Sequence, residues 1–572
     1  MPSAERDLIL SRHDLEFLLH DWLRVEELTA RERFAEHSRE TFDAVLELAA
    51  DIATERFAPH NKRNDVEEPR FVTDGGVGRA ELHEEVAPAL RAAAEAGLLS
   101  ATMDESVGGL QLPTVVGTAL QAWFHAANVG TWGYAMLTVA NANLLLAYAT
   151  PELVERYVPD MLAGRVHGTM CLSEPQAGSS LADITTRAEP QPDGSYRLTG
   201  TKMWISGGDH GLGENIVHLV LAKVPGGPAG VKGISLFLVP KVRPDGTRND
   251  VVLTGLNHKM GYRGTVNTVL SFEGAVGHLV GTEGRGLAAM FHMMNEARVG
   301  VGAGAAALAY TGYLKSLDYA KSRPQGRPAG AKDPSSPMVP IIRHADVRRM
   351  LLAQKAYAEG ALALVLYCGK LVDEQEDALL DVLTPIAKSW PSQWGLEANA
   401  LAIQVHGGYG YTREYDVEQH YRDNRLNPIH EGTHGIQGQD LLGRKVRTAG
   451  FAALRARIAS TIERAGDLPE GKQLQQSLDR LVEVTEILYA HPDAEERLAN
   501  ASVYLEAAGH IVVAWLWLDQ VLATAGREDD LAKGKRAAAR YFFRYELPKT
   551  GPQLDLLASL DTTSLDTDPA WF

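Results

Sequence analysis

Cysteine, long apolar runs and long basic runs are all scarce in this sequence of 572 residues. Only two cysteines occur, Cys171 and Cys368, which excludes a disulfide scaffold and predicts reduced thiols and a cytoplasmic location. The first 20 residues carry frequent charges and lack the apolar core of a signal peptide. The most apolar stretch, residues 511–518, is shorter than the roughly 20 residues that cross a bilayer. The sequence therefore predicts no membrane span.

The charge balance is acidic, with 73 Asp and Glu against 56 Lys and Arg and a formal net charge of −17. This balance argues against nucleic acid as a partner, because nucleic-acid binding depends on concentrated positive charge. A few arginines in one pocket can still bind a phosphorylated ligand, since salt screens distant charges. The hydrophobic share of 45% is that of an ordinary globular protein, and the length accommodates three or four domains.

Hydrophobic periodicity predicts helices first, then strands, then helices again. Helical spacing covers residues 41–57, 81–99 and 115–148. Short strand patterns separated by turn signals follow, and their spacing predicts an antiparallel barrel or sandwich. The helical pattern returns after Glu283 and is interrupted by a loop with five prolines at residues 323–340. We expect strands at residues 169–172, 196–199, 202–205, 216–222, 234–239 and 265–272, and domains at residues 1–167, 168–282, 283–446 and 447–572.

Two glycine-rich segments imitate nucleotide-binding loops. GVGAGA at residues 300–305 matches the pattern G-x-G-x-x-G/A, but its neighbours continue one helical pattern, which favours close helix packing over a dinucleotide turn. The glycines of QVHGGYG at residues 404–410 follow no strand pattern, so we interpret them as a turn after a helix. Neither segment predicts a Rossmann domain.

Two segments in the strand region carry groups that suit a ligand. MCLSEPQAGSSL, residues 170–181, leaves a strand for a loop that exposes backbone amides and hydroxyls, which can bind a heteroaromatic ring or a phosphate. The alternative is an ordinary surface turn. In KMWISGG, residues 202–208, Trp204 lies within a strand beside Ser206, where an aromatic side chain is more often part of the core. Each signal is weak when taken alone.

The segment RDNRLNPIHEGTHGIQ, residues 422–437, contains a single carboxylate after Asp423, namely Glu431. A lone glutamate is usually solvated. The Gly-Thr that follows it and the apolar Ile429 and Ile436 nearby indicate instead the wall of a dry pocket. Burial there raises the pKa of a carboxylate toward the range that a general base needs. We therefore consider Glu431 the candidate base.

In this order, MCLSEPQAGS, KMWISGG, the arginine-bearing helix MMNEARVG, QVHGGYG and IHEGTHGIQ resemble the acyl-CoA dehydrogenase family. The resemblance covers about residues 40–445 and includes GGLQLP at residues 108–113. The helical region after Arg447 looks like the long bacterial branch that includes the methylmercaptopropionyl-CoA dehydrogenases. The resemblance implies an α+β fold with an N-terminal helical domain, an antiparallel β-barrel domain, a four-helix-bundle domain and an extra C-terminal helical region.

The resemblance also implies FAD as the cofactor, with site residues in both the β region and the second helical region. Leu172 and Ser173 match contacts to the flavin pyrimidine edge, Trp204 and Ser206 match residues that cover the ring near N5, and Thr433 matches a flavin-contacting hydroxyl. Arg323 and Gln325 match a grip on the FAD pyrophosphate of a neighbouring subunit, although the proline-rich insertion is longer here than in short-chain members. Gln404 and Gly408 match contacts on its adenosine side. A site shared in this way requires a homodimer or homotetramer.

For the substrate, the resemblance implies an acyl-CoA thioester that is oxidised to a trans-2-enoyl-CoA in fatty-acid β-oxidation. Glu431 matches the family's catalytic carboxylate, which removes the α proton while the β hydride passes to flavin N5. Ser179 matches a contact to CoA, Gly432 a substrate contact, and Arg298 a basic residue near the CoA nucleotide. A salt bridge on its helix is an equally weighted alternative for Arg298. No metal ligand set is expected.

Two features leave alternatives open. His430 and His434 stand where the family more often has Tyr and Asn or Ala, so two titratable groups are expected to flank the base. The electron acceptor is expected to be an electron-transferring flavoprotein, but an acyl-CoA oxidase with oxygen as acceptor shares the same motifs. A non-catalytic flavoprotein or scaffold is the third hypothesis, and the presence of Glu431 argues against it. The acyl group itself is not predicted.

Overall fold

The computed structural model describes residues 6–331, 333 and 335–572, so Lys332 and Pro334 of the proline-rich loop lie outside it. The chain folds into two compact units. Unit 1 comprises the described residues up to Phe42, Pro113–Ala126 and Arg298–Phe572, and unit 2 comprises Asp43–Leu112 and Ala127–Ala297. Two long helices, α6 (Thr114–Tyr148) and α8 (Gly286–Ser322), each contribute residues to both units. The four expected domains remain a prediction.

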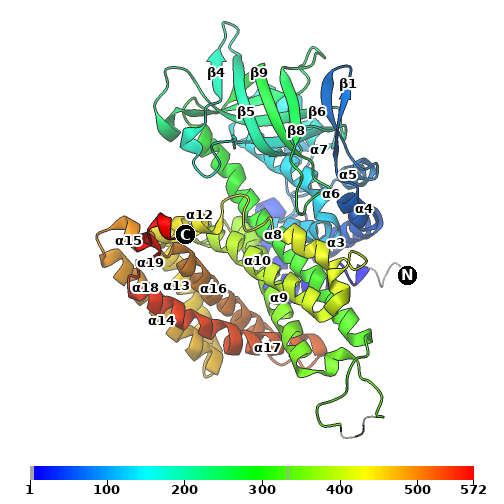
Figure 1. Cartoon of the computed structure of the whole chain (residues 1–572), viewed down its shortest axis with the longest axis vertical. Coiled ribbons are helices and arrows are strands. Elements are labelled where there is room, and N and C mark those ends of the chain that lie inside the picture. Colours follow the sequence, from blue (N-terminus) through cyan, green and yellow to red (C-terminus); the bar gives the residue numbers. More distant parts are fainter. Residues whose placement is uncertain (1–5, 332, 334) are drawn as a thin grey trace. The chain divides into compact units, whose positions relative to one another are not determined.

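The centre of unit 2 is a seven-stranded sheet in the order β3-β6-β4-β5-β9-β7, with β8 paired to β9 (Figure 1). The sheet closes on itself because β7 pairs with β6 as well as with β9. Most pairings are antiparallel, but β3 runs parallel to β6, which the expected antiparallel barrel did not include. The strands are β3 (Val166–Cys171), β4 (Arg187–Pro190), β5 (Tyr196–Ser206), β6 (Asn215–Lys223), β7 (Ile234–Pro240), β8 (Val251–Leu256) and β9 (Asn267–Val280).

All six predicted strand segments overlap strands of the sheet, and two further strands of that sheet were not predicted. The two patterns at residues 196–199 and 202–205 form one strand, β5, which has irregular pairing with β9 between Lys202 and Ile205. Strands β4 and β8 were not predicted: β4 is short and carries few apolar residues, and β8 is a short apolar run that was overlooked. The helix expected at residues 81–99 is shorter, since a hairpin of β1 (Arg70–Asp74) and β2 (Val77–Glu81) precedes α5 (Val86–Glu95).

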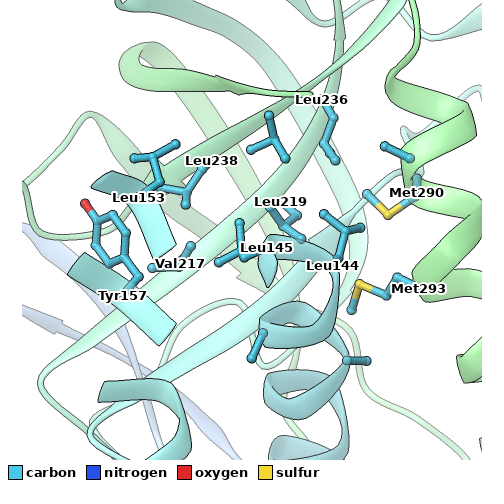
Figure 2. Close-up of a cluster of buried hydrophobic side chains, with 14 of the residues drawn as sticks. Leu144, Leu145, Leu153, Tyr157, Val217, Leu219, Leu236, Leu238, Met290 and Met293 are labelled. Atoms are coloured by element: carbon cyan, nitrogen blue, oxygen red, sulfur yellow. The ribbon is translucent and has the colours of Figure 1, made fainter. Parts of the chain in front are cut away.

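The core of unit 2 lies between helices and the inner strands (Figure 2). Leu144 and Leu145 of α6 are fully buried together with Leu219 of β6 and Met290 of α8. Strand β6 is buried along almost its whole length, which explains its unbroken apolar sequence. The remaining helices of unit 2 and its border are α3 (Arg39–Ile52), η4 (Ala53–Phe57), η5 (Ala58–His60), α4 (Asn61–Val66), η6 (Glu105–Val107), α7 (Pro151–Leu162), η7 (Leu181–Asp183) and η8 (Gly230–Gly233).

The sequence pattern suggested one continuous helix over residues 115–148. Helix α6 instead breaks at Asn128. The φ of Asn128 is −164° and its side-chain oxygen accepts a hydrogen bond from the amide of Thr131 at 3.0 Å, as the N-cap of a new helix does. The side-chain amide of Asn128 donates to the carbonyl of Phe57 at 3.1 Å. One asparagine thus starts the second half of α6 and anchors it to the preceding helices.

Unit 1 is helical. Its long helices α9 (Ala345–Glu374) and α10 (Asp377–His406) pack against each other, and α8 approaches α10 closely. A Cβ on Gly302 would lie 2.0 Å from the carbonyl oxygen of Ala387, so only glycine allows this approach. The prediction of helix packing for GVGAGA is therefore confirmed. The other elements are α2 (Arg12–Glu16), η1 (Phe17–Trp22), η2 (Val25–Ala30), η3 (Glu32–Phe34), η9 (Ile341–Arg343), η10 (Gly407–Tyr411), α11 (Val417–Asn424) and α12 (His434–Gly443).

The C-terminal region forms seven further α-helices among the described residues, and α16 lies at its centre. Helix α16 is long and apolar enough to cross a membrane, unlike the shorter run considered above, but 83% of its apolar window is buried inside the protein. A core helix meets the same criteria. The elements are η11 (Lys445–Arg447), α13 (Ala449–Ala465), α14 (Pro469–Ala490), α15 (Ala494–Leu498), α16 (Ala501–Ala523), α17 (Asp530–Tyr541), η12 (Phe542–Glu546), η13 (Leu547–Lys549), α18 (Thr550–Ala558), α19 (Thr563–Asp566) and η14 (Pro569–Trp571).

Candidate active site

Glu431 lies in unit 1, in the loop between α11 and α12, with its backbone in the left-handed region at φ +53°. Residues with a Cβ adopt this region rarely, and such backbone strain is concentrated at functional sites. Gly432 follows at φ +92°, and a Cβ there would lie 2.5 Å from Nε2 of Gln437. That Nε2 donates to the carbonyl oxygen of Glu431 at 3.0 Å. The first turn of α12 therefore holds the strained residue through its own backbone.

Lys388 on α10 holds the same loop from the other side. Its ammonium donates to the carbonyl oxygens of Asn427 at 2.7 Å and Gly432 at 2.6 Å. The side chain is fully buried. The two carbonyls lie on either side of Glu431 in the sequence, so one ammonium fixes both ends of the segment that carries the carboxylate.

A chain of buried asparagines continues this support into the helices. Asn399 on α10 donates to the carbonyl of Leu308 at 2.9 Å, and its side-chain oxygen accepts from Asn424 at 2.7 Å. Asn424 in turn accepts from Asn427 at 2.9 Å, and the oxygen of Asn427 lies 2.9 Å from Nε2 of His430. Each side-chain amide in this chain is buried and hydrogen-bonded, which rigidifies the approach to Glu431.

Burial and nearby positive charges have opposite effects on the pKa of Glu431. Burial raises the pKa of Glu431, while the positive charges of Arg298 and Lys388 lower it in part. Burial also lowers the pKa of Lys388 to about 7, against the opposing effect of Glu431. The net result is a carboxyl group whose pKa lies above its ordinary value, as a general base requires.

Arg298 forms the ion pair that was one of its two sequence interpretations. Its Nη1 lies 3.3 Å from Oδ2 of Asp440 on α12, and both side chains are buried. Asp440 also pairs with Arg444 at 2.7 Å. The partner is on another helix rather than on α8 itself, so the pair connects α8 to the helix that follows the Glu431 loop.

His430 and His434 flank the base in the sequence, as expected, but both have lowered pKa values. Burial lowers the pKa of His430 to about 3, with a further contribution from Lys388. Burial lowers the pKa of His434 to about 4. Both rings are thus neutral at neutral pH and add no charge beside Glu431. The apolar wall was predicted less well, because the side chain of Ile429 is half exposed and only Ile436 is partly buried.

In unit 2, Trp204 occupies a position suited to an external ligand. Its side chain is 57% exposed, and its backbone lies at φ +67° where β5 has irregular pairing. This result contradicts the core interpretation of an aromatic within a strand. Ser206, two residues further along, accepts a hydrogen bond from the side-chain amide of Asn267 at 3.3 Å. Both side chains belong to the same end of β5.

The loop that contains Leu172 and Ser173 is fixed to β5 by a buried ion pair. Lys202 donates to the carbonyl of Leu172 at 2.9 Å and to Glu174 at 3.0 Å. The amide of Met203 donates to the carbonyl of Ser173 at 3.0 Å. Burial raises the pKa of Glu174, but the charge of Lys202 and hydrogen bonds from Thr185 and Thr186 lower it by more, so that the pKa is about 2. The expected flavin-edge residues therefore stand on a rigid support, whereas Ser179 is exposed further along the loop.

The residues expected to reach a neighbouring subunit lie at the surface of unit 1. Gln325, Gln404 and Gly408 are exposed, and Arg323 stacks over the ring of Tyr409 at 5.5 Å. Helix α10 ends at His406, and the glycines form the turn η10, as predicted. The amide of Gln325 donates to the carbonyl of Val339 at 3.0 Å, which closes the proline-rich loop. The structure thus groups Arg323 with the QVHGGYG turn on one surface.

The structure therefore brings Glu431, Gly432 and Arg298 into one electrostatic group in unit 1, and groups Leu172, Ser173, Trp204 and Ser206 on β5 and the adjoining loop in unit 2. Thr433 begins α12 with an exposed side chain. Sequence reasoning missed the supporting residues of both groups. The sequence offered one signal for them, namely Lys388, a single lysine within the apolar helix pattern of α10. The missed residues are Glu174, Lys202, Lys388, Asn427, Gln437 and Asp440.

Comparisons with known proteins match nearly the whole chain. Four family models, described as the acyl-CoA dehydrogenase N-terminal, middle and C-terminal domains and an acetyl-CoA dehydrogenase C-terminal-like domain, match residues 39–165, 169–275, 284–445 and 454–568. The chain is 35% identical over 541 residues to the 3-methylmercaptopropionyl-CoA dehydrogenase of Ruegeria pomeroyi, which covers 90% of each chain. It is 31% identical to a butyryl-CoA dehydrogenase of Syntrophomonas wolfei, over 98% of this chain and 99% of the relative.

A solved structure supports the fold. The acyl-CoA dehydrogenase of Bacillus anthracis complexed with FAD superimposes with a TM-score of 0.74 at 20% identity, over 93% of this chain and 90% of the other. At this identity the likeness concerns the fold.

Proposed function

The chain belongs to the acyl-CoA dehydrogenase family, and we propose that it dehydrogenates an acyl-CoA thioester between the α and β carbons with Glu431 as the base. The observation that carries this proposal is the way the protein holds Glu431. Its side chain is partly buried, its backbone is kept at φ +53°, and its pKa is raised by desolvation. A solvated glutamate with a purely structural role needs none of these features.

The α proton of a thioester is far too weakly acidic for a carboxylate in water. A carboxylate withdrawn from water is a stronger base, because burial destabilises its charged form. Arg298 and Lys388 limit this effect and keep the ionised form of Glu431 accessible. When Glu431 accepts the proton it becomes neutral, which its buried surroundings favour. The protein thus supplies position and electrostatics for proton removal.

The residues of unit 2 fit a flavin. An exposed indole at Trp204, the Ser206 hydroxyl and the rigid Leu172–Ser173 backbone provide a flat apolar surface beside polar groups. Leu172, Ser173, Trp204, Ser206 and Thr433 would hold FAD by this proposal, and Arg323, Gln325, Gln404 and Gly408 would contact the FAD of a second copy. FAD, when bound, would accept the hydride that leaves the β carbon together with its two electrons.

The proposal extends to the partners. We infer an electron-transferring flavoprotein as acceptor and a homo-oligomer as the active form. The surface formed by the exposed residues Gln404, Gly408 and Tyr409, with Arg323 over the ring of Tyr409, supports the second inference. The acyl chain is to be identified with a panel of acyl-CoA thioesters.

The test is anaerobic mixing of the FAD-loaded protein with that panel while flavin absorbance is recorded. We expect bleaching by at least one thioester and at least 1,000-fold slower bleaching in Glu431→Gln, at unchanged FAD content, since loss of a catalytic base costs about that much or more. Glu483→Gln, which removes an exposed carboxylate on α14, is the matched control and should bleach normally.

Normal bleaching by Glu431→Gln refutes the assignment of the base. Formation of peroxide at the rate of turnover, without added acceptor, would instead identify an oxidase. A protein that cannot be loaded with FAD would return the scaffold hypothesis to first place.

A further inference from the structure

Three lysine side chains are fully buried in the part of the chain that the structure describes. Two of them form ion pairs, Lys202 with Glu174 at 3.0 Å and Lys535 with Glu359 at 2.9 Å. Lys388 differs, because its hydrogen bonds go to two backbone carbonyls and no carboxylate of the described residues lies within 4.0 Å of its ammonium. Burial of a charge without a directly bonded counter-charge is costly, so its retention requires an explanation.

The position of Lys388 is fixed by the helix that carries it. Helix α10 lies against α8 where Gly302 meets the carbonyl of Ala387, the residue before Lys388. A Cβ at Gly302 would lie 2.0 Å from that oxygen, so the backbone at Ala387 cannot move toward α8. The side chain of Lys388 therefore extends from a backbone that is fixed by helix packing, and its hydrogen bonds hold the loop against that helix.

We propose that Lys388 is the positioning residue for Glu431: its ammonium fixes the carbonyls of Asn427 and Gly432 on both sides of the base and stabilises the ionised carboxylate. This inference rests on the proposed function. It assigns two separable effects to one side chain. The hydrogen bonds hold a backbone that would otherwise leave φ +53°, and the charge acts on the carboxylate through space.

The charge effect must be judged against every group that faces Lys388. Glu431 acts on it from the loop, and Arg298 acts on it from α8. Lys388 in turn acts on His430 in the loop and on His434 at the start of α12, both of which are neutral at neutral pH. Glu506 on α16 acts on His434. Lys388 and Arg298 are thus the two positive charges that oppose the burial of Glu431.

The experiment compares the FAD-loaded wild type with Lys388→Met, which removes both donors and charge, and Lys388→Arg, which retains both. Lys370→Met is the matched control, since Lys370 donates to the carbonyl of Leu23 at 2.7 Å but lies on α9, away from the loop. Two quantities are measured: the pH dependence of anaerobic flavin reduction between pH 5 and 9, and amide hydrogen exchange in residues 427–433.

We expect the midpoint of the pH profile to move upward by about one unit in Lys388→Met, because a nearby opposite charge lowers a carboxyl pKa by one to three units. We expect exchange in residues 427–433 to accelerate at least tenfold in the same variant. Lys388→Arg should keep the midpoint at or below the wild-type value, because a guanidinium stays charged across this pH range whereas the pKa of Lys388 is about 7. Lys370→Met should change neither quantity. If Lys388→Met does not fold, Lys388→Gln replaces it, because Gln removes the charge and keeps a donor. Its midpoint should still move.

An unchanged midpoint together with unchanged exchange in Lys388→Met overturns the inference. Rapid exchange of residues 427–433 in the wild type overturns it without any variant, since the loop would then not be held. The two proposals fail in different ways. If no thioester reduces the wild-type flavin, the proposed function fails. The exchange comparison then still tests whether the hydrogen bonds of Lys388 hold residues 427–433. If the wild type is reduced and Glu431→Gln is not, wild-type behaviour of Lys388→Met rejects only the role of Lys388.

Discussion

Arg298 and Asp440 form a buried ion pair, 3.3 Å between Nη1 and Oδ2, that ties α8 to α12 immediately after the loop that carries Glu431. The guanidinium also acts on Glu431 through space. Asp440 compensates part of this positive charge. The remaining effect of Arg298 is electrostatic, and it lowers the pKa of Glu431. The pair thus combines a structural connection with an adjustment of the base.

The first prediction concerns pH. Glu431 acts as a base only when ionised, and burial raises its pKa, so flavin reduction should increase with pH and reach half its maximum above the ordinary glutamate value of 4.5. Arg298→Gln removes a positive charge and should move that midpoint higher still. Stopped-flow reduction by acyl-CoA across pH 5 to 9 measures both. A midpoint at or below 4.5 would contradict the buried setting of the carboxyl.

The second prediction concerns the support of the flavin-edge loop. Lys202→Met leaves Glu174 buried without its ammonium, which should destabilise the protein by about 3 to 5 kcal/mol and weaken FAD retention. Lys202→Met combined with Glu174→Gln should recover part of this loss, since no unpaired charge remains. Thermal melting and the FAD-to-protein absorbance ratio are the measurements. A double variant less stable than Lys202→Met would show that the carboxylate does not depend on the lysine.

The Glu174 carboxylate also predicts a pH dependence of stability. Its pKa in the folded protein is about 2, below the ordinary value, so it stabilises the fold above the unfolded value near 4.5. That contribution should disappear as the pH falls from about 4.5 toward 2, and Glu174→Gln should lack this part of the acid transition.

The third prediction concerns a buried histidine. Both ring nitrogens of His125 on α6 lack a hydrogen-bond partner among the described residues, and burial lowers its pKa to about 4. Below pH 6.5 His125 binds a proton in the unfolded chain but stays neutral in the folded protein. The free energy of unfolding therefore falls as the pH falls, by at most about 1.4 kcal/mol per pH unit. His125→Leu should raise the melting temperature and reduce its decrease between pH 7.5 and 5.

The control for this prediction is His13→Leu, because the side chain of His13 is 88% exposed and should not contribute to that decrease. A lower melting temperature for His125→Leu at pH 7.5 would mean that the imidazole is satisfied by a buried water molecule.

The sequence predicted helices and apolar strands because their periodicity directly reflects burial. Strand β6 and the helical interpretation of GVGAGA are examples. The short strand β4 was missed because its neighbour β5, rather than its own apolar residues, holds it in the sheet, whereas β8 has buried apolar residues and was simply overlooked. The parallel pairing of β3 with β6 depends on chain topology, which residue patterns do not encode.

The sequence offered candidates where a motif carries the residue and none where a residue supports another. Glu431 was proposed from its motif, whereas Lys388 was hidden in an apolar helix pattern in which a lysine normally extends to solvent. The strand pattern alone favoured a core position for Trp204, and only the family resemblance indicated a flavin contact, because periodicity does not reveal the irregular pairing that turns its indole outward. Asn427 accepts from Lys388 through its backbone carbonyl, and the side-chain amide of Gln437 donates to the backbone carbonyl of Glu431; no sequence signal exists for such bonds.

Helix α12 has a second neighbour. A Cβ on Gly438 would lie 2.6 Å from the carbonyl of Ala501 at the start of α16, and the Tyr489 hydroxyl donates to the carbonyl of Leu442 at 2.5 Å. Leu441 and Leu442 are almost completely covered. A protease cut after Thr448 should therefore leave two fragments that copurify and refold only together, because each would otherwise present bare leucines to water.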